Sequence, residues 1–438
     1  MSNRKDLFYD FPPTSDKEWK EKIISDLKGK TFEETLLWRD ENDITHKPYY
    51  RSSDTENRPI IKEIQSSQAN SLGWKSVQVF SNSTEKLKSK IKESLSSGVD
   101  EVVIKEVSDA KSTTTLIGDH LKDSAHVHLH LTELANNNIP KNYFTDPIGE
   151  TLKNGKNKEE DLTALKELFQ KRLNQLKPDN FLLVDGSIYK NAGATIVQEL
   201  AFTLHHAVEY IDLLTNAGYT PEAITRSFTF KLGFGTSYFS EIAKARAARF
   251  LIKKIFNLYE VTSEVKIWGE ASSYYLTHKD PYSNLLRLSS QCMSAILGNC
   301  NLVSLPAYDH WGEHSTLGYR MSKNISLILK NESYFNEVKD LTSGSYYVES
   351  LSADFAEEAW KLFLDIEKEG GLMNQLQNGK LIKMINSSKI DRNNTYINKD
   401  RTMVGVNKFL NVQETDLSPT IEMGSGLTNA ILSKDIKQ

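Results

Sequence analysis

The feature that most constrains the fold is an alternation of short apolar segments with longer amphipathic ones, which continues for some 250 residues from about residue 74. The short segments have the length and composition of buried strands, and the segments between them have helical periodicity. Repeated strand–helix units predict a parallel sheet, which is either a closed (β/α)8 barrel or an open doubly wound sheet. The predicted strands are 76–80, 101–107, 126–131, 181–185, 227–232, 264–268 and 301–305. The predicted helices are 84–96, 159–174, 194–217, 237–258 and 281–297.

Phosphate-binding loops do not decide between the two sheets. The stretch "GFG" at 233–235 is followed by Tyr238 at the position where a dinucleotide fingerprint needs glycine, and no G-x-x-x-x-G-K-[ST] motif occurs. These observations weaken the reading as an open nucleotide-binding sheet without excluding it.

The segments that flank the strand–helix repeat divide the chain further. Residues 1–70 read as an extended N-terminal arm, with one helix that starts at Ser15 or Asp16 and ends at Gly29. We assign residues 71–345 to the repeat and 346–438 to a C-terminal segment whose helices close the barrel. We expect the last 25 or so residues of this segment to be frayed.

Composition excludes several classes of protein. The 438 residues carry a formal net charge of -4, which gives no argument for nucleic acid or an anionic membrane as a partner. No run of 18 apolar residues predicts a transmembrane helix, and the first residues do not resemble a signal peptide. The two cysteines, Cys292 and Cys300, match no zinc motif, so we expect buried thiols and a cytoplasmic protein.

The stretch "HVHLHL" at 126–131 places three histidines on one face of a predicted strand and three apolar residues on the other. Neutral imidazole is a common metal ligand, and His-x-His pairs on barrel strands occur in metal-dependent hydrolases. A metal site would need further ligands that converge from other strands. The alternative is a solvated or hydrogen-bonded strand face, and the pattern alone leaves both open.

Several longer stretches resemble the methylmalonyl-CoA mutase family, in order, over roughly residues 8–410. They are "FPPTSDKEWKEKIISDLKGKTFEETLLWRDENDITHKPYY", "NAGATIVQELAFTLHHAVEYIDLLTNAG", "FTFKLGFGTSYFSEIAKARAARFL", "DPYSNLLRLSSQCMSAILGNC", "GSYYVESLSADFAEEAWKLFLDIEKEGG" and "VGVNKF". The resemblance implies a (β/α)8 barrel, followed in full-length subunits by a flavodoxin-like cobalamin domain. It also implies the adenosylcobalamin-dependent rearrangement between succinyl-CoA and methylmalonyl-CoA in propionate metabolism.

The chain departs from the family at the positions that carry chemistry. The family's Tyr-His pair before the "AGA" helix matches Ser187 and Ile188, and isoleucine cannot transfer a proton or form a hydrogen bond through its side chain. The Arg, His and Gln of a second catalytic stretch match Lys266, Trp268 and Glu270. The family's "TRPWTIRQYAG" segment has no match, and the cobalt-ligating D-x-H-x-x-G is absent. We therefore assign no catalytic, cofactor-binding or metal-binding residue to this chain.

These departures, together with the resemblance, imply a small, non-catalytic subunit of a heterodimeric mutase. The N-terminal arm would wrap a catalytic large subunit, which would bind adenosylcobalamin and the CoA ester. Active barrels of the family line their lumen with small polar side chains that leave a channel for CoA. We expect His126, His128, His130 and Trp268 to fill that channel here.

Three alternatives remain at this stage. The barrel could use a separately encoded cobalamin domain, as some acyl-CoA mutases do. It could also be a free-standing CoA-ester-binding barrel, or a metal-dependent hydrolase. Asp185 and Glu270 lie near predicted strand ends, where barrel catalysts cluster, but no matched acid–base partner is visible for either.

Overall fold

The computed structural model describes residues 14–69, 71–118, 124–132, 142–154, 163, 166–167, 170, 181–311, 315–410 and 427–435. The chain divides into two compact units, Met1–Arg51 and Ser52–Gln438. Most of the helix predicted at 159–174 lies outside the described residues.

The N-terminal unit contains two short helices and a hairpin, which are α1 (Asp16–Asp26), α2 (Phe32–Leu36), β1 (Trp38–Arg39) and β2 (Thr45–His46). Ser15 caps α1 in a reciprocal capping box with Glu18, as the sequence predicted for this helix start. His46 is buried, stacks on the ring of Trp38 at 3.9 Å and lies 3.1 Å from the carboxylate of Asp40.

Eight parallel strands of the second unit close into a barrel in the order β10-β3-β4-β5-β6-β7-β8-β9. The predicted (β/α)8 barrel is therefore confirmed, and the open sheet is excluded. Seven of the strands correspond to predicted segments, although β9 begins three residues later than expected and β6 was missed. The strands are β3 (Lys75–Ser81), β4 (Glu101–Val107), β5 (Val127–Leu131), β6 (Tyr143–Thr145), β7 (Leu182–Asp185), β8 (Phe228–Phe234), β9 (Ile267–Ala271) and β10 (Leu302–Ser304).

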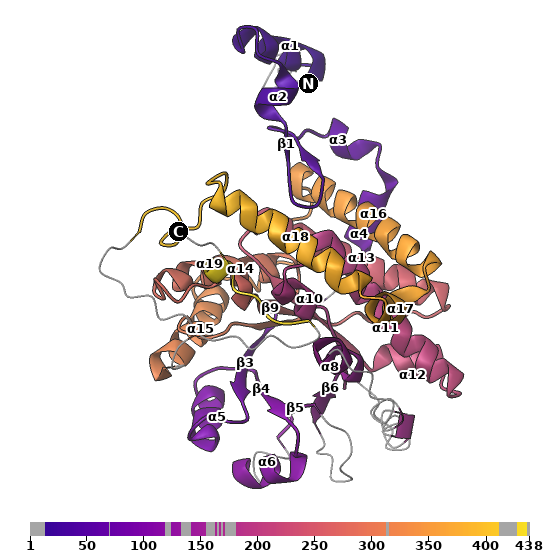
Figure 1. The fold of residues 1–438 in the computed structure, drawn as a ribbon, viewed down its shortest axis with the longest axis vertical. Helices are drawn as coiled ribbons and strands as arrows, with labels where there is room; N and C mark the ends of the chain where they lie inside the picture. The colour runs from indigo at the N-terminus through magenta and orange to yellow at the C-terminus, as the bar shows by residue number, and fades with distance from the viewer. Residues whose placement is uncertain are drawn as a thin grey trace, which may run out of the picture. The chain divides into compact units, whose positions relative to one another are not determined.

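Helices follow the strands and cover the outside of the barrel (Figure 1). Their inward faces are apolar, as in α13, where Ile242, Leu251 and Ile252 are buried. The helices are α5 (Leu87–Ser96), α6 (Ala110–Ile117), α8 (Pro147–Asn154), α10 (Ser187–Ala192), α11 (Ile196–Asn216), α12 (Pro221–Arg226), α13 (Tyr238–Leu258), α14 (Ser283–Leu297) and α15 (Thr316–Asn331).

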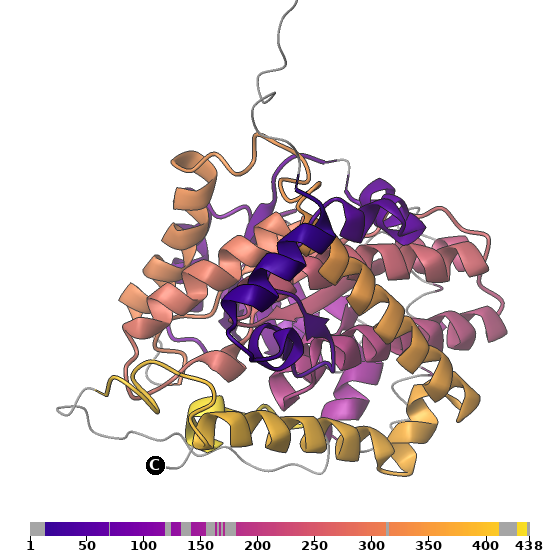
Figure 2. The same ribbon diagram turned by 90° about the horizontal axis from the view of Figure 1, so that it is seen from above.

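Further helices pack outside this ring. The orange-to-gold helices α16 (Tyr346–Lys368) and α18 (Lys380–Ile397) run along the edge of the unit in Figure 2, with α17 (Gly371–Gln377) between them in sequence. α16 packs against α11 and α13.

The boundary of the N-terminal arm differs from the predicted residue 70. The second unit begins at Ser52 and includes α3 (Ser53–Glu56) and α4 (Pro59–Ser67). Ile61 and Ile64 of α4 are buried, and this helix packs against α13 and α16. The polar residues that flank α4 in the sequence obscured the apolar periodicity of these two buried side chains.

Part of the predicted frayed tail is packed. Residues 427–435 include the short helix α19 (Leu432–Asp435), and Leu432 is buried in a cluster with Tyr275 and Met403. The intervening residues 411–426 lie outside the described part of the chain.

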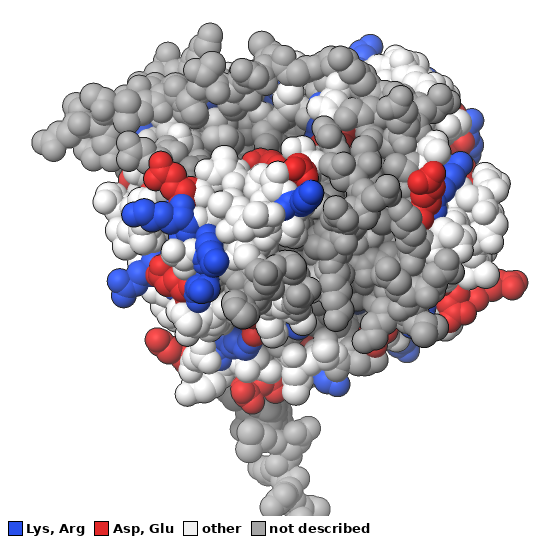
Figure 3. Space-filling model, turned by 90° about the horizontal axis from the view of Figure 1, so that it is seen from below, with Lys and Arg blue, Asp and Glu red and all other residues white. Residues whose placement is uncertain are grey.

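The surface and the cysteines agree with the composition. Lysine and arginine are interspersed with aspartate and glutamate on the face drawn in Figure 3. Within the residues that the structure places, no helix is both long and apolar enough to cross a bilayer. Cys292 and Cys300 are free, buried thiols, as predicted.

Candidate functional site

The register of the strands identifies the side chains that enter the barrel lumen. Paired residues of neighbouring strands point to the same face of a sheet. His130 pairs with Phe144, and Lys231 pairs with Trp268. Val103 pairs with His128, so these residues from β4, β5, β6, β8 and β9 share the inner face.

A packed apolar layer occupies the centre of the lumen. The ring of Phe144 stacks on that of His128 at 5.1 Å between centroids and lies 5.8 Å from that of Trp268. The indole N–H of Trp268 donates to Ser304 Oγ at 2.8 Å, which fixes the orientation of the ring. The remaining buried members of this layer are Val77, Val103, Leu183 and Leu302. Bulky side chains thus fill the inside of the barrel, as in most barrels of this type.

The three histidines of "HVHLHL" occupy different depths. His126 is exposed before the start of β5, with Nδ1 at 3.0 Å from the carbonyl oxygen of Asp100. Burial lowers the pKa of His128 to about 4, with Lys266 and Lys75 also disfavouring its charge and Glu101 opposing them. Burial likewise lowers the pKa of His130 to about 4.

The geometry around these histidines is not that of a metal site. His128 Nε2 lies 3.6 Å from Glu101, which is beyond hydrogen-bond distance. His130 Nε2 has no hydrogen-bond partner among the residues that the structure describes. In the placed part of the chain, no group of three or more His, Cys, Asp or Glu side chains is arranged to hold a metal ion.

The end of the barrel at which the strands begin is polar. Lys75 Nζ lies 2.7 Å from Glu101 Oε1. A cleft of about 730 Å³ opens here between the starts of β3, β9 and β10 and is lined by Lys75, Lys266 and Leu302, among others. Leu302 belongs to the central packed layer, so the cleft meets that layer at this residue.

Charged side chains bridge three strands at the opposite end, where barrel active sites are built. Lys231 Nζ of β8 lies 2.8 Å from Glu270 of β9 and 3.7 Å from Asp185 of β7. The ammonium also lies 4.8 Å from the centre of the Trp268 ring. Burial disfavours the charge on Lys231, but Asp185 and Glu270 outweigh this effect and raise its pKa. Glu270 and Trp268, both predicted substitutions of catalytic positions, thus form one cluster.

Ser187 and Ile188 lie on α10, next to this charged cluster. The Ser187 hydroxyl and backbone N–H both donate to Asp185 Oδ1. Ile188 is buried and contributes no polar atom. Lys266, in contrast, lies at the other end of the barrel, so the structure separates it from the remaining substituted positions.

A second buried ionic network holds α10, α11 and α13 against β8. Lys244 Nζ lies 2.8 Å from Glu199 and 2.5 Å from Glu241, and Lys190 lies 3.2 Å from Glu241. All four side chains are at most 1% exposed. Glu199 also accepts a hydrogen bond from the backbone N–H of Gly233 at 2.7 Å. The four charged groups pair with one another, so the network holds these elements together. These groups are not directed into the lumen.

Sequence reasoning missed Phe144, which completes the central aromatic stack. It lies on β6, whose three residues "YFT" are too few to show an alternation. The bridging role of Lys231 was also missed, since it depends on the register between three strands.

The fold defines a (β/α)8-barrel protein with a charged cluster at the carboxyl ends of its strands. The sequence model of the methylmalonyl-CoA mutase family matches residues 145–429. This chain belongs to that family.

Individual relatives agree with the family match. The methylmalonyl-CoA mutase small subunit of Porphyromonas gingivalis is 29% identical over 444 residues, which cover 93% of this chain and 72% of the relative. The small subunit from Propionibacterium freudenreichii subsp. shermanii is 30% identical over 61% of this chain and 42% of its own length. The methylmalonyl-CoA mutase of Rhizobium meliloti is 30% identical over 57% of this chain and 36% of its own length. The matched part of this chain thus spans less than half of the last two relatives.

Proposed function

We propose that this chain is the small, non-catalytic subunit of a heterodimeric, adenosylcobalamin-dependent methylmalonyl-CoA mutase in the cytoplasm. Its partner, a catalytic large subunit, would bind both the cofactor and the CoA ester and would carry out the rearrangement. The single observation that carries the proposal is the packed layer of His128, Phe144 and Trp268 across the lumen. A CoA ester could reach the far end of the barrel only by displacing these side chains.

The polar groups beyond the packed layer support the same proposal. Lys231 is engaged by Asp185 and Glu270, and Ser187 donates to Asp185. These groups stabilise one another and leave no free acid–base pair directed at a substrate. Ile188 adds no proton donor or acceptor.

Neither of two histidines near this end of the barrel, His206 and His130, is available to ligate cobalt. A histidine that ligates cobalt from the protein surface must present a free ring nitrogen. His206, on the nearby helix α11, is fully buried, and its Nε2 lies 2.9 Å from the carboxylate of Asp146. His130 is enclosed in the lumen with its pKa lowered by burial. The unavailability of these two histidines supports our proposal that the cofactor binds to the partner.

The test is co-expression with the catalytic large chain of the same organism, followed by purification, cobalamin analysis and turnover assays. We expect a stoichiometric complex whose cobalamin and turnover belong to the partner. Failure to form a complex, or turnover by this chain with an added cobalamin domain, would contradict the proposal. The second result would favour the alternative mutase barrel.

The variant Glu270→Gln separates a structural role from a catalytic one in the same assay. It keeps the size of the side chain and removes the charge that pairs with Lys231. We expect an unchanged kcat for the complex. A large loss of kcat in a complex that still assembles would mean that this barrel takes part in the chemistry.

A further inference from the structure

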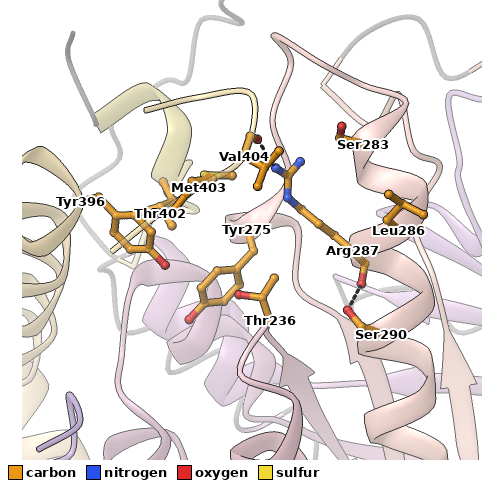
Figure 4. Close-up of a pocket in the computed structure, with 11 residues that line it drawn as sticks. Thr236, Tyr275, Ser283, Leu286, Arg287, Ser290, Tyr396, Thr402, Met403 and Val404 are labelled. Carbon is orange, nitrogen blue, oxygen red and sulfur yellow. Dashed lines mark hydrogen bonds between the residues drawn. The ribbon is translucent and has the colours of Figure 1, made fainter. Parts of the chain in front are cut away.

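A cavity of about 350 Å³ lies outside the barrel lumen, between α14, the end of α18 and the segment that follows it (Figure 4). Its volume is at the lower end of the range of about 300–1,000 Å³ that is usual for small-molecule sites. Nothing in the proposed function of the subunit uses this cavity, so the inference below does not depend on that function.

One wall of the cavity is apolar and well packed. Tyr275, Tyr396, Met403 and Leu432 line it, and all four belong to one buried cluster. In Figure 4, Tyr396 and Met403 lie on the side opposite Arg287, with Tyr275 between them. Such a wall suits the flat or branched apolar body of a small molecule.

The opposite wall carries one cation, Arg287 of α14. Its guanidinium donates to Asn284 Oδ1 at 2.9 Å and to the carbonyl oxygen of Val404 at 2.6 Å. Its other three N–H groups make no hydrogen bond to the residues that the structure describes. In the placed part of the chain, no carboxylate forms an ion pair with Arg287. Asp280 attracts the charge of Arg287 from a greater distance. The Asp280 carboxylate accepts hydrogen bonds from Ser283.

Two further features favour an anion at this wall. Burial lowers the pKa of Arg287 from its ordinary value, because the attraction of Asp280 does not fully offset the loss of hydration. The exposed hydroxyls of Thr236 and Thr402 also line the cavity and can donate to a group bound there. A carboxylate would restore a counter-charge to Arg287 and could accept from such donors.

We propose that this cavity binds a small monocarboxylic acid, with its aromatic or branched body against Tyr275, Tyr396 and Met403 and its carboxylate against Arg287. The guanidinium recognises the charge, and the apolar wall excludes strongly hydrated anions. The site lies in the full chain and requires neither CoA nor cobalamin.

Isothermal titration calorimetry of the full-length chain tests the proposal with benzoate, benzyl alcohol and benzamidine, which share a ring and differ in charge. We expect benzoate to bind saturably at one site and benzamidine to bind at least about tenfold more weakly, because a charged hydrogen bond contributes about 1.5–3 kcal/mol. No saturable binding of benzoate, or equal binding of benzamidine, would overturn the proposal.

Two variants and a control locate the site. Arg287→Met should weaken benzoate binding at least about tenfold, and Thr236→Trp, at an exposed position, should block the cavity without removing the hydrogen bonds of Arg287. Arg320→Met, on α15 and outside this cavity, should bind benzoate as the unaltered chain does. Unchanged binding in the folded Thr236→Trp variant would place benzoate elsewhere and refute the assignment.

Discussion

At the scale of single residues, a few bulky side chains pack against one another across the barrel lumen. Trp268 replaces a position that the family resemblance assigns to a catalytic histidine, and its indole is held by Ser304. His128 and His130 are kept neutral by burial, so they pack as aromatic side chains among apolar neighbours.

The variant Trp268→Ala should destabilise the chain by about 3–5 kcal/mol, because it leaves a cavity in the packed layer and removes the donor to Ser304. Urea unfolding followed by circular dichroism measures this loss. Trp360→Ala, at a half-buried position of α16, should cost clearly less. Equal costs for the two variants would mean that the lumen is loosely packed.

The neutral histidines predict a pH dependence of stability. The pKa of the buried imidazole is about 4 in the folded chain and about 6.5 in the unfolded chain. Between these two pH values, the folded state therefore binds fewer protons than the unfolded state. Stability should therefore fall as the pH is lowered from about 6.5 to 4, on the order of a few kcal/mol per buried imidazole. His130→Leu should make this fall shallower.

The surroundings of His130 define the control for this experiment. Lys153 and Lys231 disfavour its charge, and Asp185 and Asp146 favour it, but burial is the largest influence. The exposed His126→Gln variant should retain the steep pH dependence of the unaltered chain. The account is contradicted if His126→Gln flattens the unfolding curve and His130→Leu does not.

At the scale of elements, buried charges fix the helices against the barrel. Lys244 forms ion pairs with Glu199 and Glu241. Glu199 also accepts a hydrogen bond from the backbone N–H of Gly233 in β8. α10, which carries Ser187 and Ile188, enters the same network through Lys190. The position of α10 at the end of the barrel is therefore coupled to α11 and α13.

The variant Lys244→Met should cost about 3–5 kcal/mol of stability, since it leaves two buried carboxylates with too little positive charge. The double variant Lys244→Met/Glu199→Gln should recover part of that loss, because it removes one of the two uncompensated charges. Additive losses in a double-mutant cycle of urea unfolding would show that the pair is not coupled.

Much of the element order follows from hydrophobic periodicity, and the exceptions have physical causes. The long helices α11, α13 and α14 begin and end within two residues of the predicted bounds. Each helix is long enough for its hydrophobic periodicity to repeat over several turns. β6 has only three residues, and Gly269 and Glu270 interrupt the strand pattern of β9.

The candidate site could be predicted only in part. Alternation in β5 placed the histidines on one face, and the family resemblance placed Trp268 and Glu270. The pairing of neighbouring strands brings Lys231 between Asp185 and Glu270. Periodicity within a strand assigns side chains to one face, but it does not identify which residues of the neighbouring strands pair with them. The partner Phe144 was missed because β6 is too short to show an alternation.

At the scale of the whole molecule, the chain is a mutase-family barrel, and we propose that its lumen is closed. The family match covers residues 145–429, and a small-subunit relative covers 93% of the chain. A barrel closed in this way would serve the assembly through its surface and its stability, because a bound partner stabilises the folded state.

The most direct test counts ligands in the purified complex with the catalytic large chain. Calorimetric titration of the complex with succinyl-CoA to saturation gives the number of CoA-ester sites for each pair of subunits. The account predicts one site for each pair, and the same number in a complex that carries Glu270→Gln in this chain. Two sites for each pair would show that a CoA ester enters this barrel too, and the claim of a closed lumen would be wrong.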